Sequence, residues 1–134
     1  MRAWFGDTSF FLALISKTDE HDRKALEYAS ALSLDVITTT WVLAEIGDAL
    51  CARHRRTQFS DLLTFIEMNP RMVILPPSRR EFDAGISLYK SRRDKEWPLT
   101  DCITFKVMEQ MELSEALTAD AHFEQAGYRA LLLD

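Results

Sequence analysis

Four carboxylates are the residues of this sequence best suited to do chemistry together. Asp7, Asp101 and Asp120 lie where a buried strand gives way to a helix or where a helix begins, and Glu45 lies inside an otherwise apolar helix. Carboxylates that share a pocket repel one another unless a cation lies among them, and hard divalent ions such as Mg²⁺ prefer carboxylate oxygens. If the four acids converge, they favour a metal-dependent phosphodiesterase.

Each acid also has an ordinary explanation when it is taken alone. Asp7, Asp101 and Asp120 stand where acids stabilise the first turn of a helix without any further role. Glu45 is harder to explain this way, because it lies in the apolar segment WVLAEIGDAL and an unpaired buried carboxylate is unfavourable. Asp48 shares part of its helical face and is a candidate assisting residue, unless both acids lie on a strip that faces solvent.

Alternating strands and helices are the elements that would position these acids. Short apolar or β-branched runs predict strands at residues 3–6, 35–39, 72–75, 116–118 and 128–133. Thr40 is predicted to cap a helix from Trp41 to about Arg53, and Ser78 to Glu81 has capping-box spacing. A further helix is predicted to open at Thr100 or Asp101, and a brief one to cover residues 120–125.

This alternation predicts a single α/β domain over residues 1–134, with a mostly parallel central sheet covered on both faces. Parallel strands place their carboxyl ends at one edge of the sheet, where ligands bind. Acids that are far apart in the sequence can therefore meet in one anionic pocket.

The charge balance at first argues against a nucleic-acid partner, because the net charge is −5 and the isoelectric point is near 5.2. The four acids account for −4 of that charge, and bound divalent ions would offset it. Basic residues are also bunched, which favours contacts with a phosphate backbone or solvated helix ends. The bunches are Arg53-His54-Arg55-Arg56, Arg79-Arg80, and Arg92-Arg93 followed by Lys95.

The two cysteines and the N-terminal segment predict a cytoplasmic protein without a membrane anchor. Cys51 and Cys102 show no CxxC or Cys/His spacing and are interpreted as small buried hydrophobic residues in a reducing compartment. The apolar N-terminal run is interrupted by Asp7 and is too short to span a bilayer.

Four segments in order resemble the PIN-domain nucleases, and most closely the VapC-type ribonuclease toxins of toxin–antitoxin pairs. They are GDTSFFLAL, TTTWVLAEIGDAL, PLTDCITFKVME and ALTADAHFEQAGY. The resemblance implies a three-layer α/β/α fold with four to five strands. It also implies that one or two Mg²⁺ or Mn²⁺ ions are bound by Asp7, Glu45, Asp101 and Asp120.

The same resemblance suggests roles for residues around the acids. Ser9 and Thr118 stand at hydroxyl positions that orient a water or a neighbouring carboxylate, although both also fit ordinary helix caps. Phe123 is expected in the core, and His122 is expected to be a surface or structural histidine more often than a base. Gly6 stands where many relatives carry an aliphatic residue, and we expect it to loosen the strand end without affecting ligation.

By this resemblance the chain is expected to hydrolyse phosphodiester bonds in single-stranded regions of RNA, with Arg53, Arg55 and Arg56 as candidate backbone contacts. Divalent ions can supply both the nucleophilic water and charge relief, so no nucleophilic serine or cysteine is needed. If the protein is a toxin, a cognate antitoxin and a homodimer are implied. The alternatives are an RNA-processing nuclease without an antitoxin and a non-catalytic RNA-binding scaffold.

Two other protein classes that gather acids at strand ends fit poorly. A haloacid-dehalogenase-type phosphatase needs a second aspartate two residues after the first, where this sequence has Ser9. A response-regulator receiver needs its phospho-acceptor after the third strand, where this sequence has Pro76-Pro77.

Overall fold

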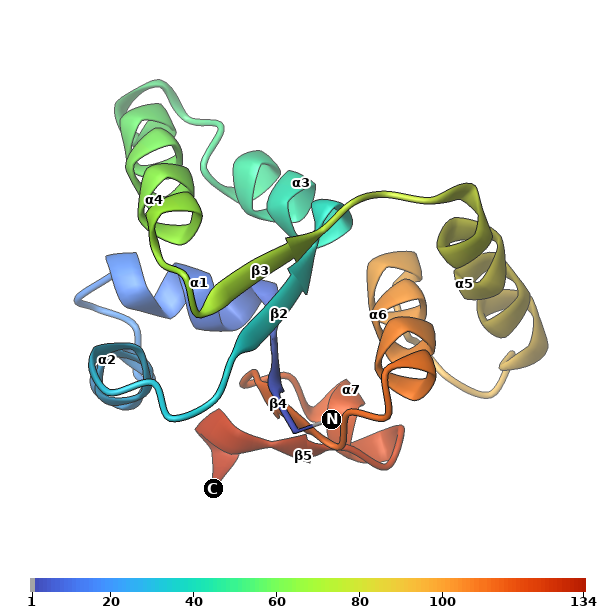
Figure 1. Cartoon of the computed structure of the whole chain (residues 1–134). Helices are drawn as coiled ribbons and strands as arrows, with labels where there is room; N and C mark the ends of the chain where they lie inside the picture. Colours follow the sequence, from blue (N-terminus) through green and yellow to red (C-terminus); the bar gives the residue numbers. More distant parts are fainter. Residues whose placement is uncertain (1) are drawn as a thin grey trace.

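A five-stranded sheet forms the middle of the molecule, and every neighbouring pair of strands in it is parallel (Figure 1). The computed structural model describes residues 2–134. The strand order is β3-β2-β1-β4-β5, and the strands are β1 (Trp4–Gly6), β2 (Val36–Thr39), β3 (Met72–Leu75), β4 (Glu115–Leu117) and β5 (Arg129–Ala130). The predicted α/β class with a parallel central sheet is confirmed.

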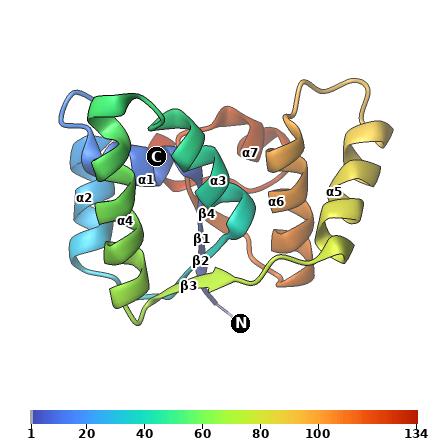
Figure 2. The same ribbon diagram turned by 90° about the horizontal axis from the view of Figure 1, so that it is seen from above.

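Helices cover both faces of this sheet and give the predicted three-layer α/β/α arrangement. They are α1 (Thr8–Ile15), α2 (Asp22–Ser30), α3 (Thr40–Ala49), α4 (Arg56–Met68), α5 (Arg79–Ser91), α6 (Leu99–Gln110) and α7 (Ala121–Gln125). Helices α1, α2 and α4 lie on one side, and α5, α6 and α7 lie on the other, with α5 on the outside of α6 (Figure 2). Helix α3 contacts α1 and α4 as well as α6.

The core is built mainly from apolar residues of the strands and of the helices that pack on the sheet. Phe5, Ile37 and Ala116 on the three central strands are almost fully buried, as expected when helices cover both faces. Phe123 is also fully buried and packs edge-to-face on Phe105, with ring centroids 5.0 Å apart. Its predicted core position is confirmed.

The strand order reverses direction at β1, whose neighbours are β2 on one side and β4 on the other. The first three strands extend the sheet from β1 through β2 to β3, whereas the last two strands extend it from β1 through β4 to β5. Open parallel sheets bind ligands at such a switch point, outside the carboxyl ends of the strands. Asp7 follows β1 directly, and Asp120 follows β4 at the same edge.

Several element ends differ from the sequence-based predictions. Thr39, not Thr40, caps α3, because its side-chain oxygen accepts from the Val42 N–H at 3.2 Å. Helix α3 ends at Ala49 rather than near Arg53, and a 3₁₀ turn (Arg53–Arg55) precedes α4. The last predicted strand is only two residues long, and the apolar residues after it form a 3₁₀ turn (Leu131–Leu133). In this turn the Leu132 N–H donates to the carbonyl of Thr118, the residue after β4, at 3.1 Å.

The early end of α3 also overturns the prediction for one cysteine. Cys51 follows the last helical turn and is exposed, so its interpretation as a buried hydrophobic residue is wrong. Cys102 lies inside α6 and is buried as predicted. The predicted cap at Ser78 is confirmed, because its side chain accepts from the Glu81 N–H at 3.2 Å.

Gly6 does not loosen the end of β1, contrary to expectation. It is buried, and a Cβ atom at this position would lie 2.8 Å from Val36 Cγ1 and 3.0 Å from Phe11 Cζ. Its carbonyl accepts from the Thr38 hydroxyl at 2.8 Å. The missing side chain therefore lets Phe11 close over the strand immediately before Asp7.

No helix in residues 2–134 is long and apolar enough to cross a bilayer.

Candidate active site

Asp7 is held in the buried end of β1 by contacts to β4. Its backbone N–H donates to the Leu117 carbonyl at 3.1 Å, and its Oδ2 accepts from the Thr118 hydroxyl at 2.8 Å. Only 4% of Asp7 is exposed. The side chain is therefore fixed between the two strands where the sheet order reverses.

Two hydroxyls extend this contact into a small network. Thr118 Oγ1 lies 3.1 Å from Ser9 Oγ and accepts from the Asp120 N–H at 3.0 Å, while Ser9 Oγ accepts from the Ala119 N–H at 3.0 Å. These bonds join the first turn of α1 to the loop after β4. Ser9 and Thr118 thus lie together beside Asp7, which suits the orienting role predicted for them.

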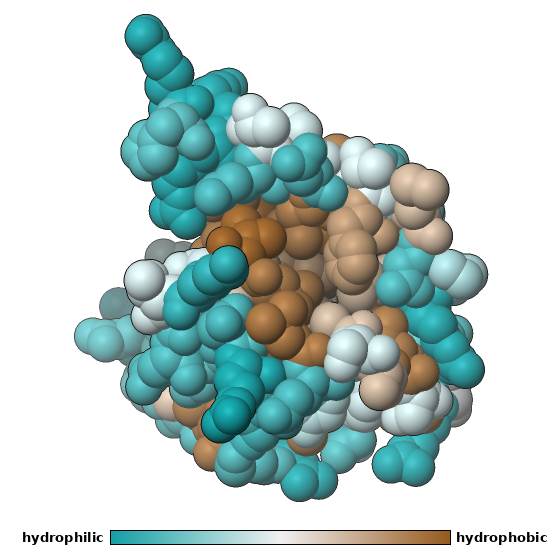
Figure 3. Space-filling view, turned by 90° about the vertical axis from the view of Figure 1, so that its left-hand side faces the viewer, coloured by the Kyte–Doolittle hydropathy of each residue, from teal (hydrophilic) through white to brown (hydrophobic). Residues whose placement is uncertain are grey.

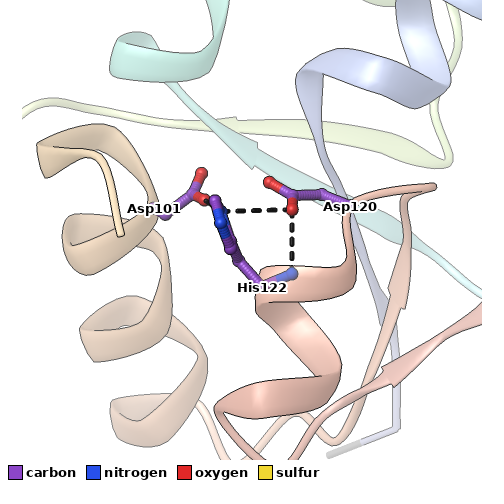
Figure 4. A group of neighbouring side chains, drawn as sticks. All are labelled: Asp101, Asp120 and His122. Carbon is purple, nitrogen blue, oxygen red and sulfur yellow. Dashed lines mark hydrogen bonds and ion pairs between the residues drawn. The ribbon is translucent and has the colours of Figure 1, made fainter. Parts of the chain in front are cut away.

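Asp101 and Asp120 meet across His122 (Figure 4). Asp101 lies in the first turn of α6 and is 4% exposed, whereas Asp120 caps α7 by accepting from the His122 N–H at 2.8 Å. The His122 Nδ1 atom lies 3.1 Å from Asp101 Oδ2 and 3.2 Å from Asp120 Oδ1. One potential ligand atom from each of the three residues lies within 4.8 Å of the others.

Glu45 approaches this group from α3. It is half-buried and accepts a hydrogen bond from the Thr8 hydroxyl at the start of α1. Its negative charge contributes to raising the pKa of both Asp7 and Asp101. The structure therefore brings all four predicted acids to the same edge of the sheet.

Burial makes the two inner acids reluctant to ionise. Loss of solvent contact raises the pKa of Asp7 to about 7, although the Thr118 hydrogen bond and the Thr8 N–H oppose this shift. Burial also raises the pKa of Asp101 to about 9, and the negative charges of Asp7, Asp120 and Glu45 add to the effect. Both shifts have the direction expected for desolvated carboxylates that repel one another.

Within the described part of the chain, the four acids lack a permanently charged basic partner. Across residues 2–134, no lysine or arginine forms an ion pair with any of the four, and His122 is the basic side chain that contacts them. Carboxylate oxygens are hard ligands that suit Mg²⁺ and Mn²⁺, and an imidazole nitrogen adds a donor that transition metals accept more readily. The donor set therefore fits divalent cations.

Two contacts at the site were not anticipated from the sequence. Thr8 looked like an ordinary residue at a helix start, and its partner Glu45 is 37 residues away, so no local pattern marks the pair. His122 follows Asp120 at a spacing of two, and this histidine next to a helix-capping acid is the sequence feature that could have placed it at the site.

Other predicted residues lie outside these contacts. Asp48 is exposed, and its side chain makes no hydrogen bond or ion pair within the described part of the chain. Arg53 is exposed, the Arg55 Nε donates to Gln58 Oε1 at 3.3 Å, and Arg56 Nη1 donates to the Cys51 carbonyl at 3.0 Å. Their roles in assisting Glu45 and in binding RNA stay predictions.

Comparison with known protein families decides the family. The family model described as PIN domain matches residues 5–127. The chain belongs to the PIN-domain family. This PIN domain matches no curated protein sequence.

Solved structures share the fold at low sequence identity. The VapC20 toxin of Mycobacterium tuberculosis, described as cleaving the sarcin-ricin loop, is 20% identical, with a TM-score of 0.85 and coverage of 94% of this chain and 96% of that one. VapBC2 from Rickettsia felis, bound to a promoter DNA fragment, is 15% identical, with a TM-score of 0.68 and coverage of 97% and 96%. FitAcB from Neisseria gonorrhoeae is 19% identical, with a TM-score of 0.65 and coverage of 97% and 95%.

Proposed function

We propose that this PIN domain is a metal-dependent endoribonuclease that cuts single-stranded regions of RNA. The observation that carries the proposal is the convergence of Asp7, Glu45, Asp101 and Asp120 at one sheet edge, with no lysine or arginine partner among residues 2–134. These four residues form an acid cage, which is unfavourable by itself and becomes favourable when divalent cations occupy it. The likeness to a toxin described as cleaving the sarcin-ricin loop supports RNA as the substrate.

The side chains divide the work of holding the ions. Asp101, Asp120 and His122 offer three donors within 4.8 Å of one another, and Asp7 and Glu45 extend the site toward β1 and α3. Thr118 fixes one oxygen of Asp7, and Thr8 fixes one oxygen of Glu45, so each carboxylate keeps its second oxygen free to bind. Divalent ions bound here supply a nucleophile at neutral pH and neutralise charge on the phosphate.

Cleavage of a labelled single-stranded RNA with added Mn²⁺, and with EDTA as the blank, tests this function. Asp101→Asn should lower kcat/KM by at least about 100-fold, because it removes an anionic ligand while keeping the shape of the side chain. Glu124→Gln is the matched control, since Glu124 is an exposed acid on α7. Full activity of the Asp101→Asn protein, or equal loss in both variants, would contradict the proposal.

A comparison within α3 separates Glu45 from Asp48. Glu45 contacts Thr8, and its negative charge contributes to raising the pKa of Asp7, whereas Asp48 is exposed. We therefore expect Glu45→Gln to abolish most cleavage and Asp48→Asn to change kcat/KM by less than about threefold. A large loss from Asp48→Asn would support the assisting role predicted for it from the sequence.

The alternative of a non-catalytic RNA-binding scaffold makes a different prediction in the same samples. A scaffold that keeps the acid cage would still gain thermal stability from Mn²⁺ but would leave the RNA intact. An active nuclease should gain thermal stability from Mn²⁺ and also cut the RNA.

Arg53, Arg55 and Arg56 are proposed as contacts to the RNA backbone. Replacing all three by alanine should weaken RNA binding and also reduce its dependence on salt concentration.

An antitoxin is the proposed partner, and an apolar groove supports it. Figure 3 shows a hydrophobic hollow on the face that carries α1, α2 and α4. Its volume is about 380 Å³, and its apolar lining includes Leu14, Ile15, Leu26, Leu62 and Phe65. Leu26 and Phe65 are 46% and 44% exposed, and such patches commonly bind the apolar face of a helix.

Co-purification with the product of a neighbouring small reading frame tests the partner. Leu26→Asp with Phe65→Asp should release the antitoxin while leaving RNA cleavage intact, because neither side chain lies at the acid cage. Continued co-purification of the antitoxin with this double variant would place the partner elsewhere. The implied homodimer is tested on the same protein by light scattering, where a monomer mass of 15.5 kDa would contradict it.

A further inference from the structure

A second pocket lies between the end of α5 and the start of α6. Its volume is about 420 Å³, and its lining is unusually rich in cations for an acidic protein. The residues that matter for its chemistry are Tyr89, Arg92, Arg93, Lys95 and Trp97. Glu96 is the one carboxylate in the lining.

The loop that carries the cations is held in place by Trp97. The Arg92 guanidinium lies 5.0 Å from the centroid of the Trp97 ring, and Lys95 Nζ lies 5.9 Å from it. Trp97 is only 6% exposed, and its indole N–H donates to Gln125 Oε1 at 3.1 Å. The aromatic ring therefore fixes two positive charges at the pocket wall before any ligand arrives.

The cations differ in how far they are already neutralised. Arg92 donates two hydrogen bonds to Asp94, at 2.9 and 3.0 Å, and Asp94 has its pKa lowered to about 2 by this contact. Within residues 2–134, Arg93 and Lys95 form no ion pair. These two side chains are therefore available to an anion.

The pocket and the acid cage are connected by the start of α6 and by the contact of Trp97 with α7. Pro98 lines the pocket and caps α6, and Asp101 stands in the first turn of that helix. Gln125, which holds Trp97, belongs to α7, which also carries His122. A strand of RNA with one phosphate at the cage therefore has a second cationic contact within its reach.

We infer that this pocket binds a backbone phosphate of the RNA on one side of the scissile bond, through Arg93 and Lys95. The inference rests on the proposed function, because it assigns a subsite to the same substrate. Tyr89 is 55% exposed at the pocket wall and offers a ring on which the neighbouring base can stack, which requires an unpaired base. The subsite thus favours single strands over duplexes.

RNA binding measured by fluorescence anisotropy in EDTA tests the subsite without any cleavage. Arg93→Ala with Lys95→Ala should weaken binding of a single-stranded 12-mer about tenfold and lower the slope of log K against log salt by about 0.7, which corresponds to one lost phosphate contact. Lys17→Ala with Arg23→Ala is the matched control, because both residues are exposed cations outside the pocket. Arg93→Lys with Lys95→Arg should keep wild-type binding.

The outcomes distinguish the subsite from the proposed function. Equal affinity and salt slope in the pocket and control variants overturn the subsite, even if Mn²⁺-dependent cleavage is intact. A selective loss in the pocket variant supports the subsite even if no cleavage is found. Displacement of the RNA by inorganic phosphate at micromolar concentration would assign the pocket to a free anion. If the pocket variant loses binding of an acidic peptide but keeps its RNA affinity, the pocket belongs to a protein partner. Either result contradicts the inference.

Discussion

The acid cage and the cationic pocket both lie at the start of α6 but hold their charges in opposite ways. In the cage, Asp7 and Asp101 are buried beside other acids, and burial raises the pKa of both. In the pocket, Arg92 is paired with Asp94 and stacked near Trp97, and Arg93 is open to solvent. Ionisation of the two buried acids is therefore unfavourable in the metal-free protein, whereas the Arg92 charge at the pocket is already compensated by Asp94.

The largest expected effect comes from removing the buried charge of Asp7 from the acid cage. Asp7→Asn should lower cleavage by at least about 100-fold, because an amide cannot replace an anionic ligand. The same change should raise the melting temperature in EDTA at pH 8 by on the order of 5 °C, because it removes a buried charge. Calorimetry of both proteins checks this, and a lower melting temperature for the variant would show that the Asp7 charge is already compensated.

The pH dependence of the unfolding free energy should show the cost of ionising the two buried acids, Asp7 and Asp101. In the folded, metal-free protein Asp7 and Asp101 hold protons up to about pH 7 and about pH 9, whereas in the unfolded chain they release them near 3.8. The folded state then binds more protons than the unfolded state, so stability falls as the pH rises from about 4 to about 9 and is fully present below that window.

Melting curves in EDTA measure this dependence directly. The melting temperature should fall by roughly 10 °C between pH 5 and pH 9. The double variant Asp7→Asn with Asp101→Asn is the control and should show a much flatter profile. A wild-type melting temperature that rises across this range, or one that falls as steeply in the control, would contradict the account.

An intermediate effect on stability is expected from disturbing the contact between α5 and α6, the helices on either side of the pocket. A Cβ atom on Gly85 would overlap Ile103 Cγ1 and lie 2.9 Å from Ile103 Cα, so Gly85→Ala must push the helices apart. We expect a loss of about 1–3 kcal/mol in unfolding free energy. Gly47→Ala is the control, because its nearest contact, Phe59 Cζ at 3.5 Å, is ordinary; equal stability of both variants in urea would refute the tight contact.

The smallest effect should isolate the pocket from the cage. Trp97→Phe keeps an apolar ring but loses the hydrogen bond to Gln125 and part of the attraction to Arg92 and Lys95. RNA affinity in EDTA should fall about threefold, while Mn²⁺ affinity stays unchanged. If Mn²⁺ affinity falls and RNA affinity does not, Trp97 supports the cage and not the pocket.

The sequence predicted the elements whose signals are local. The β-branched and apolar run at Met72–Leu75 and the cap at Ser78 depend only on neighbouring residues, and both are found. The end of α3 was missed because no Gly or Pro marks it, and the chain tightens there through the Cys51 N–H and the Asp48 carbonyl. That error also misplaced Cys51.

Contacts between distant segments were predictable only in outline. Parallel strand topology indicated that the acids share an edge, but nothing in the sequence paired Thr8 with Glu45 or set His122 between Asp101 and Asp120. The basic run Arg92-Arg93 was visible, yet its pocket depends on Trp97 being fixed by Gln125, 28 residues away. Side-chain partners of this kind are decided by packing and not by local pattern.

Binding of Mn²⁺ measured by titration calorimetry on the wild-type protein and on Asp101→Asn tests the central claim most directly. If the four acids form a cage that requires divalent cations, the wild-type protein takes up one or two ions with release of protons, and the variant loses this uptake. Absence of uptake by the folded wild-type protein at pH 8, or equal uptake by the two proteins, would contradict it.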